Sequence, residues 1–390
     1  MTMDTVACER LLAFCRAALC EQQCMPLSLQ NDEELAALYA CAAHHDVAHI
    51  VSDGLYRAGL LDTKTQTGEQ FQRAQMLAVF RYEHQRAEAA RIFALLEEAG
   101  IEHLALKGSV LRSLYAHPWM RTSSDIDVLV HREDVERASE LLIERLDYRR
   151  DEDWLYNFSL YSPTGVHLEL HFELAEDGCS AVGSALLSDV WSYTLPVEDQ
   201  RYGRKLSDDM FYYYHVEHMA KHFGVGGCGI RTFMDLWLLE HRVEHDRAAR
   251  DELLRKGGLL TFADAARGVC EAWFSGEPMS ELGAAMAKYV LQGGVFGTVE
   301  NAIAVEKSSE GHGELRHVMQ RIFMPYESLV AAYPSLKGRR YLTFFYQIRR
   351  LISRVLGGRL GRGLNEVKRR ASIDQERVAT VKDLFDRLGI

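Results

Sequence analysis

The sequence predicts an α+β fold, in which a small mixed sheet is flanked by mainly α-helical regions on both sides. Two observations favour this fold. Short apolar runs bounded by Gly, Pro and Ser, typical of strands and turns, gather between residues 102 and 174. On either side, apolar residues recur at helical spacing. The 390 residues suffice for two or three domains, and we expect three regions: 1–85, 86–205 and 206–390.

The composition is that of an ordinary globular protein, with 47% hydrophobic and 26% charged residues. A formal net charge of −11 argues against general affinity of the surface for nucleic acid or acidic membranes. No apolar run approaches the ~20 residues of a membrane span, and the first residues lack a basic start followed by an apolar signal core. We therefore expect a cytoplasmic protein.

The amino-terminal region, 1–85, is expected to form a helical cap. Leu11, Cys15 and Leu19 fall at helical spacing, and Asn31 precedes a second helical pattern. Zinc binding is one interpretation of the cysteines here, but Cys-x-x-Cys pairs are missing, which favours reduced, mostly buried thiols. The chain contains eight cysteines: Cys8, Cys15, Cys20, Cys24, Cys41, Cys179, Cys228 and Cys270.

A helix expected over 71–99, ended by Gly100, leads into a strand over 102–107. The strand ends at Lys107-Gly108-Ser109, and a helical turn follows over 110–116. A strand that turns directly into a helix presents unpaired backbone N–H groups and the positive end of the helix dipole. Gly108 and Ser109 are therefore candidates for holding a phosphate.

The next strand, 125–130, reads Asp-Ile-Asp-Val-Leu-Val. Because successive strand side chains point to opposite faces, Asp125 and Asp127 share one face while Ile126 and Val128 point into the core. Two carboxylates on one face repel each other unless a cation lies between them. Hard divalent ions such as Mg²⁺ prefer carboxylate oxygens and complete their shells with water and phosphates. A phosphate cradle beside paired aspartates indicates nucleotide handling.

A helix is expected over 133–146. Two strands follow, over 154–161 and 166–174, and the Ser-Pro-Thr-Gly between them predicts a hairpin. In the second strand, apolar side chains alternate with a polar face made of His167, Glu169, His171 and Glu173.

A Gly-Ser pair after a strand, then a short helix and a strand with alternating aspartates, resembles the nucleotidyltransferase fold of the polymerase β type. The form LKGSVL…R…SDIDVLV resembles in particular a bacterial group of uncharacterised nucleotidyltransferases. The resemblance is firm over residues 95–172. It implies transfer of a nucleoside monophosphate from a nucleoside triphosphate, such as ATP, to an acceptor hydroxyl, with Mg²⁺ or Mn²⁺ as cofactor. The acceptor stays open among protein, small molecule and RNA.

The same resemblance implies a set of metal ligands. Asp125 and Asp127 would bind metal, and a third acid on a later strand would complete the site. Glu169, the central acid of the polar face, fits best, and Glu173 is the alternative. Because three clustered carboxylates repel each other without metal, we expect Glu169→Gln to leave the metal-free protein as stable or slightly more stable.

Phosphate contacts are implied on the other side of the site. Gly108 and Ser109 would hold the phosphates, while Lys107 and Arg121 would neutralise their charge. His171 is expected either to contact phosphate or to hydrogen-bond a metal ligand.

Three histidines, His215, His218 and His222, lie on one face of a helix that follows Ser207. Zinc binding is one interpretation. The resemblance implies instead that this helix packs over the active cleft, with His218 and His222 as possible substrate contacts.

The glycine-rich stretch 224–229 lacks a Walker lysine and predicts a turn. Arg231 and Asp235, one helical turn apart, are expected to pair. The segment 337–370 has eleven basic residues and one acid. It is interpreted as an amphipathic helix paired with the protein's own acids, a phosphate-binding wall, or a surface for a nucleic-acid or membrane partner. Two other functions stay open: a catalytically silent nucleotide-binding module, and an interaction module working through this segment.

Overall fold

The computed structural model describes residues 5–20, 31–153, 156–175, 181–294, 301, 305 and 375–390. The chain folds into two compact units, Met1–Thr298 with Asp386–Ile390, and Val299–Phe385. The helix α18 (Gln375–Leu388) falls largely within the second unit. The basic segment 337–370, Cys24 and Cys179 lie outside the described residues.

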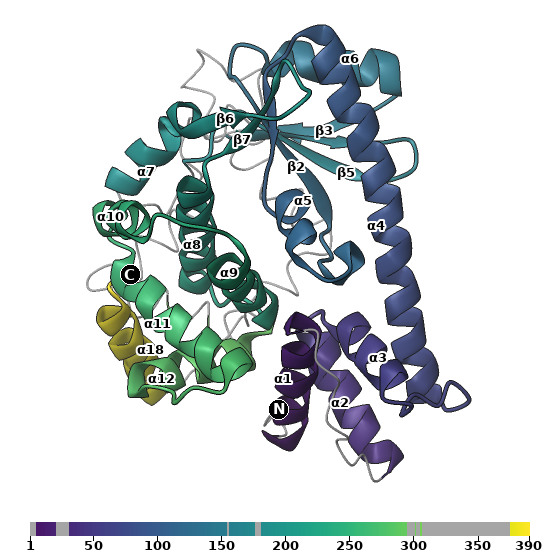
Figure 1. The fold of residues 1–390 in the computed structure, drawn as a ribbon, viewed down its shortest axis with the longest axis vertical. Helices are drawn as coiled ribbons and strands as arrows, with labels where there is room; N and C mark the ends of the chain where they lie inside the picture. Colours follow the sequence, from purple (N-terminus) through teal and green to yellow (C-terminus); the bar gives the residue numbers. More distant parts are fainter. Residues whose placement is uncertain are drawn as a thin grey trace, which may run out of the picture. The chain divides into compact units, whose positions relative to one another are not determined.

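Helices open the first unit, as the sequence predicts for residues 1–85 (Figure 1). They are α1 (Thr5–Leu19), α2 (Asp32–His44), α3 (Ala48–Arg57) and α4 (Gln66–Ala99). The helix α4 begins earlier than expected, at a cap where Thr65 Oγ1 accepts the N–H of Gly68 at 3.1 Å. It ends at Gly100, whose φ of 69° is the left-handed conformation that glycine adopts without strain.

The described residues form one mixed sheet of seven strands, in the order β3-β4-β5-β2-β1-β7-β6. The pairs β2–β5 and β1–β7 are parallel, and the other neighbours are antiparallel. The expected mixed sheet and the β4–β5 hairpin are therefore confirmed. The sequence does not predict β3, whose residues are all charged, or the short β6 and β7. The strands are β1 (His103–Ala105), β2 (Asp125–Val130), β3 (Arg149–Asp153), β4 (Asn157–Tyr161), β5 (His167–His171), β6 (Thr194–Pro196) and β7 (Gly203–Leu206).

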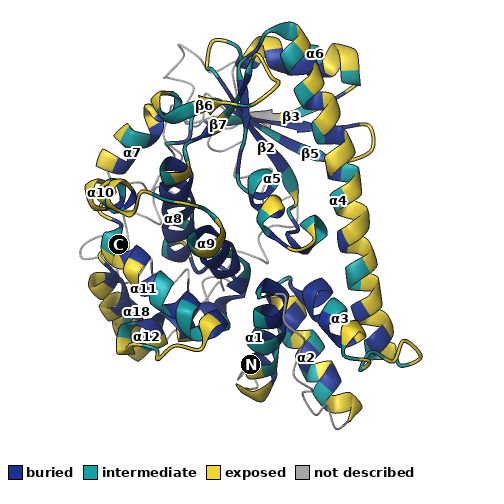
Figure 2. Ribbon diagram, in the orientation of Figure 1, coloured by how far each residue is buried: buried dark blue, intermediate teal, exposed yellow. Residues whose placement is uncertain are grey.

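The apolar face of the sheet packs against α4 and α6 (Val135–Leu146). Ile126 and Val128 of β2, Leu168 and Leu170 of β5, and Leu142 of α6 join one buried cluster. In Figure 2, buried residues are dark blue, and they make up most of β2. Fully burying one such aliphatic side chain stabilises the fold by about 1.5–3 kcal/mol. Because strand side chains alternate, this packing turns the aspartates of β2 to the opposite face.

Three short helical turns follow β1: α5 (Gly108–Leu111), η1 (Arg112–Leu114) and η2 (Pro118–Met120). The helical turn expected over 110–116 is therefore divided between α5 and η1. Between the sheet's later strands lie α7 (Ala181–Ser188) and η3 (Val190–Tyr193). After β7 come α8 (Asp208–Gly224), α9 (Ile230–Arg242), α10 (Arg247–Gly257), α11 (Leu260–Cys270), the π-helical turn η4 (Glu271–Ser275) and α12 (Glu281–Gly293).

The glycine-rich stretch 224–229 joins α8 to α9, which confirms the expected turn. The described cysteines are free thiols; those at intermediate exposure are Cys20 and Cys41, and the buried ones are Cys8, Cys15, Cys228 and Cys270. No helix in the described ranges is both long and apolar enough to cross a membrane.

Candidate active site

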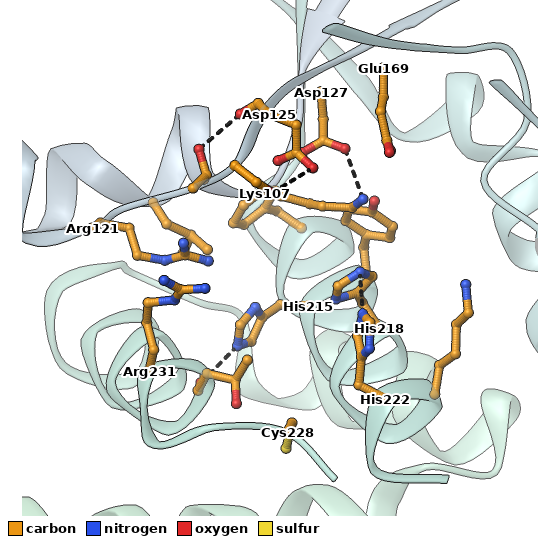
Figure 3. A pocket seen from close by; sticks show the side chains of 18 of the residues that line it. Lys107, Arg121, Asp125, Asp127, Glu169, His215, His218, His222, Cys228 and Arg231 are labelled. Carbon is orange, nitrogen blue, oxygen red and sulfur yellow. Dashed lines mark hydrogen bonds and ion pairs between the residues drawn. The ribbon is translucent and has the colours of Figure 1, made fainter. Parts of the chain in front are cut away.

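Three carboxylates meet on one face of the sheet, where β2 runs beside β5. The parallel register pairs Asp127 with Glu169 and Asp125 with His167. Ligand atoms of Asp127, Glu169 and His171 all lie within 4.8 Å of one another, and so do those of Asp125, His167 and Glu169. Glu169 therefore lies at the distance expected of a third metal ligand, within about 6 Å of both aspartates. Figure 3 shows the three acids side by side.

The junction between β1 and α5 faces these carboxylates. Lys107 has a φ of 44°, a strained conformation for a residue with a side chain. Its Nζ lies 2.8 Å from Oδ1 of Asp127. A Cβ on Gly108 would approach Cβ of Ser123 to 3.2 Å, so glycine allows this helix start to lie against the loop before β2. As the first residue of α5, Gly108 has an N–H without an intrahelical partner.

The three carboxylates differ in how their charges are balanced. Burial raises the pKa of Asp127, but the charges of Lys107 and His171 outweigh it and hold this pKa well below its ordinary value. A hydrogen bond with His171 lowers the pKa of Glu169. Burial and the charges of Asp127 and Glu169 raise the pKa of Asp125. Two of the carboxylates are therefore stabilised as anions, and Asp125 is not.

His171 is buried behind the carboxylates. Its side chain is 1% exposed, and its Nε2 lies 3.0 Å from Oδ1 of Asp127 and 3.2 Å from Oε2 of Glu169. Asn157 donates a further hydrogen bond from Nδ2 to Oε2 of Glu169, at 3.2 Å. His171 thus holds the carboxylates of Asp127 and Glu169 in place.

The acids line a cavity of about 520 Å³, called the main cavity below. Opposite the sheet, its helical wall comes from α8 and α9 (Figure 3). The helix α8 therefore covers the carboxylates, as the resemblance implies. The helical wall consists of Phe211, Tyr214, His215, His218, Lys221, His222, Arg231 and Thr232, together with Cys228 from the connection between the two helices.

The three histidines of α8 have different partners. Nε2 of His215 lies 3.1 Å from the carbonyl oxygen of Thr232, and the Nε2 atoms of His218 and His222 are 3.2 Å apart. Burial lowers the pKa of His215, and burial together with the charge of Lys107 lowers that of His218 well below its ordinary value. Both imidazoles are therefore neutral at pH 7. Among the described residues, neither group that could hold a metal includes these histidines.

A buried ion pair supports the loop before β2. Arg121 donates from Nε to both carboxylate oxygens of Asp235, at 2.9 and 2.8 Å, and Tyr115 donates to the same carboxylate at 2.7 Å. The expected pair between Arg231 and Asp235 is wrong. Asp235 is fully buried and faces the loop, whereas Arg231 donates to Asp46 at 2.6 Å.

Arg112 extends this support to the acidic strand. It donates to Oγ of Ser123 at 2.6 Å and to the carbonyl oxygen of Arg121 at 3.2 Å. Gln85 of α4 donates to the carbonyl oxygen of Ser123 at 3.1 Å. Ser123 in turn donates from Oγ to the carbonyl oxygen of Asp125, at 2.8 Å. The network therefore fixes the backbone from which the Asp125 carboxylate projects.

The structure brings most of the expected site residues together. Ser109 is not part of the cavity lining, and its N–H donates to the carbonyl oxygen of Leu106 at 3.1 Å. Glu173 is also outside the lining, and its Oε1 accepts the N–H groups of Leu174 and Ala175. The expected residues that line the main cavity are Lys107, Gly108, Arg121, Asp125, Asp127, Glu169, His218 and His222.

Sequence reasoning missed other lining residues. Lys221 lies three residues after His218, a spacing that places it on the same helical face and that could have revealed it. Asn157 reaches the site because the antiparallel ladder pairs it with His171. Arg231 reaches it through the packing of α9. No local sequence pattern predicts that Asn157 or Arg231 reaches the site.

A family model described as uncharacterised nucleotidyltransferase matches residues 31–275, well over half of the chain. The chain belongs to this family. The matched range includes every residue that lines the main cavity. The protein is therefore a nucleotidyltransferase, an enzyme class defined by transfer of a nucleoside monophosphate.

The solution structure of the antibiotic-resistance factor ANT(2'')-Ia is similar to this chain at 14% sequence identity. The similarity covers 44% of this chain and 90% of that one, with a TM-score of 0.33. No curated protein matches the sequence.

Proposed function

We propose that this enzyme transfers a nucleoside monophosphate from a nucleoside triphosphate, such as ATP, to an acceptor hydroxyl with Mg²⁺ or Mn²⁺ bound. The observation that carries the proposal is the meeting of Asp125, Asp127 and Glu169 in one cavity. Clustered carboxylates attract divalent cations, and such cations bind the phosphates of a nucleotide. The products would be the modified acceptor and pyrophosphate.

The donor set fits a hard divalent cation, because carboxylate oxygens are its preferred ligands. Burial and, after it, the charges of Asp127 and Glu169 raise the pKa of Asp125, and a divalent cation bound there would offset both effects. Asp125, Asp127 and Glu169 would hold the ions. Two ions bound there would polarise the α-phosphate and lower the pKa of the acceptor hydroxyl.

The residues around the acids would orient the triphosphate. The N–H of Gly108, in the first turn of α5, would donate to a phosphate oxygen. Lys107 would neutralise phosphate charge from its position beside Asp127. Arg121 already shares its charge with buried Asp235, so we assign it a weaker contribution.

The helical wall would receive the rest of the substrates. His218 and His222 face the acids across the main cavity, and as hydrogen-bonding groups they would contact nucleotide or acceptor. The acceptor itself stays open among protein, small molecule and RNA.

The test is transfer of label from each of the four α-³²P nucleoside triphosphates, with Mg²⁺ or Mn²⁺ and a cell lysate as source of acceptors. We expect labelled product that Glu169→Gln abolishes. The matched control is Glu173→Gln, a nearby glutamate outside the main cavity, which should keep transfer. Nucleotide binding without transfer under all these conditions would identify a catalytically silent module and contradict the proposal. Equal rates for wild type and Glu169→Gln would place the third acid elsewhere.

A further inference from the structure

The amino-terminal half of α4 has an unusual surface. Between Glu69 and Glu83, thirteen consecutive residues contain no acid and no lysine, and their charges are the arginines Arg73 and Arg81. Among the residues of this stretch, Met76 is 66% and Phe80 is 64% exposed, and Figure 2 shows exposed residues recurring along the helix. Exposed methionine, phenylalanine and arginine, with acids and lysine depleted, are the composition of protein–protein interfaces.

A second cavity of about 400 Å³, called the side cavity below, opens beside this surface. One face of α4 lines it together with residues of α2 and α3. Arg73 and Arg81 both reach it, and within the described part of the chain no hydrogen bond or ion pair holds either guanidinium. In a chain of formal net charge −11, two arginines without a carboxylate partner on one cavity indicate an anionic ligand.

The side cavity lies next to the main cavity. Asp46 lines the side cavity and Arg231 lines the main cavity, and these two residues form an ion pair of 2.6 Å. Thr122, which also lines the side cavity, accepts from Arg231 at 2.8 Å and donates to Asp46 at 3.1 Å. The ion pair between Asp46 and Arg231 therefore joins the linings of the two cavities.

The spacing of the arginines suits an extended peptide. Eight residues of α-helix separate Arg73 from Arg81, a rise of about 12 Å. In an extended strand, acidic side chains four residues apart are separated by about 13 Å. Leu77 lies between the arginines on the same cavity and offers apolar surface to the residues between the two acids.

We propose that residues 70–81 of α4, with the side cavity, form a docking surface for an acidic, apolar peptide segment of a partner protein. Charge complementarity selects the acids, and the exposed side chains of Met76, Leu77 and Phe80 select the apolar residues between them. A nucleic acid is disfavoured, because two arginines among aliphatic side chains on an acidic protein lack the basic patch that phosphate backbones require. This docking does not depend on the proposed transfer reaction.

The test is selection of a phage-displayed library of random twelve-residue peptides on the full-length chain, with counter-selection on the double variant Arg73→Glu, Arg81→Glu. We expect enriched peptides with two acids four residues apart and apolar residues between them. Fluorescence anisotropy of a synthetic winner should show binding at least tenfold weaker for the double variant. Absence of enrichment over the counter-selection, or enrichment of basic peptides, would overturn the proposal.

A matched control is Arg86→Glu, which changes an exposed arginine of the same helix that is already paired with Glu83. It should bind the peptide as the wild type does, and all variants should melt at the wild-type temperature because the changed side chains are exposed. Two further outcomes would refute the proposed occupant. One is that a fluorescein-labelled twenty-nucleotide RNA binds more tightly than the selected peptide and that Arg81→Glu removes this binding. The other is a dimer in light scattering that Phe80→Glu dissociates, which would assign the surface to a second copy of this chain.

Discussion

The sheet wall and the helical wall of the main cavity hold their polar side chains in different ways. On the sheet, the parallel ladder fixes Asp127 beside Glu169, and Lys107 and His171 balance their charges at hydrogen-bond distance. On the helices, burial lowers the pKa of His215 and its imidazole stays neutral. On the sheet wall, neutralising Asp127 should therefore destabilise the fold, whereas neutralising Asp125 should stabilise it. On the helical wall, protonation of His215 should destabilise the fold.

The largest effect is expected from removing charge at the two aspartates of β2. Asp125→Asn and Asp127→Asn should each lower transfer by about three orders of magnitude, because metal ions supply several kcal/mol of transition-state stabilisation. Their effects on stability should differ. Asp127→Asn removes the carboxylate that pairs with Lys107 and leaves His171 with Glu169 alone, and it should cost about 2–3 kcal/mol. Asp125→Asn relieves repulsion and should raise the Tm of the metal-free protein by about 1–3 °C.

Thermal melts in the presence of a chelator measure this difference, with the transfer assay alongside. Equal Tm shifts for the two variants would mean that neighbouring cations offset the charges of Asp125 and Asp127 equally.

For Glu169→Gln, the sequence predicts a metal-free protein that is as stable as the wild type or slightly more stable, but the contacts of Glu169 predict a different result. A hydrogen bond with His171 lowers the pKa of Glu169, so Glu169→Gln should destabilise the protein slightly. Among the three acids, only the change at Asp125 is expected to stabilise the metal-free protein by relieving repulsion.

The next largest effect concerns the ion pair that joins α9 to the loop before β2. Asp235→Asn leaves the Arg121 guanidinium buried beside a neutral amide, and breaking a buried pair of this kind costs about 3–5 kcal/mol. Chemical denaturation should show this loss. Arg86→Ala, which breaks an exposed pair with Glu83, is the control and should denature at the wild-type midpoint. A wild-type midpoint for Asp235→Asn would show that the loop is held by other contacts.

A smaller effect should appear on acidification. Because their pKa values are lowered in the folded state, His215 and His218 stay neutral there, while the unfolded chain takes up protons near pH 6.5. The unfolded state then binds more protons, so the free energy of unfolding should fall as pH drops below about 6.5, by up to about 1.4 kcal/mol per pH unit for each histidine. Denaturation curves from pH 8 to pH 5 measure the slope.

His218→Gln should flatten this slope, and His117→Gln, at an exposed position, should leave it unchanged. An unchanged slope for His218→Gln would mean that this imidazole is not kept neutral by the fold.

The smallest effect is expected where α5 meets the loop before β2. In Gly108→Ala, the new Cβ lies 3.2 Å from Cβ of Ser123, which must shift by a few tenths of an ångström. Since Ser123 holds the backbone of Asp125, we expect the KM for nucleotide to rise about tenfold with little change in Tm. Gly224→Ala is the control, since a Cβ there has no neighbour within 4 Å. Similar KM values for the two variants would show that the close approach at Gly108 is not needed.

The sequence by itself determined the local features of this protein. Strand alternation placed Asp125 and Asp127 on one face and Ile126 and Val128 in the core, and the structure confirms both. Gly100 marked the end of α4, because a left-handed helix end favours glycine. These features depend on neighbours a few residues apart along the chain, so a single sequence is enough to predict them.

Only the tertiary structure decided which distant residues became partners. The parallel register of β2 and β5 places Glu169, and not Glu173, beside Asp127. Of the two contacts expected of His171, phosphate or a carboxylate of the site, the fold shows the second, at Asp127. Helical spacing predicted that Asp235 pairs with Arg231, but its buried carboxylate binds Arg121 instead. A buried charge pairs with whichever ion the packing brings to it, since water cannot compensate it there, and that packing is set by segments more than a hundred residues apart.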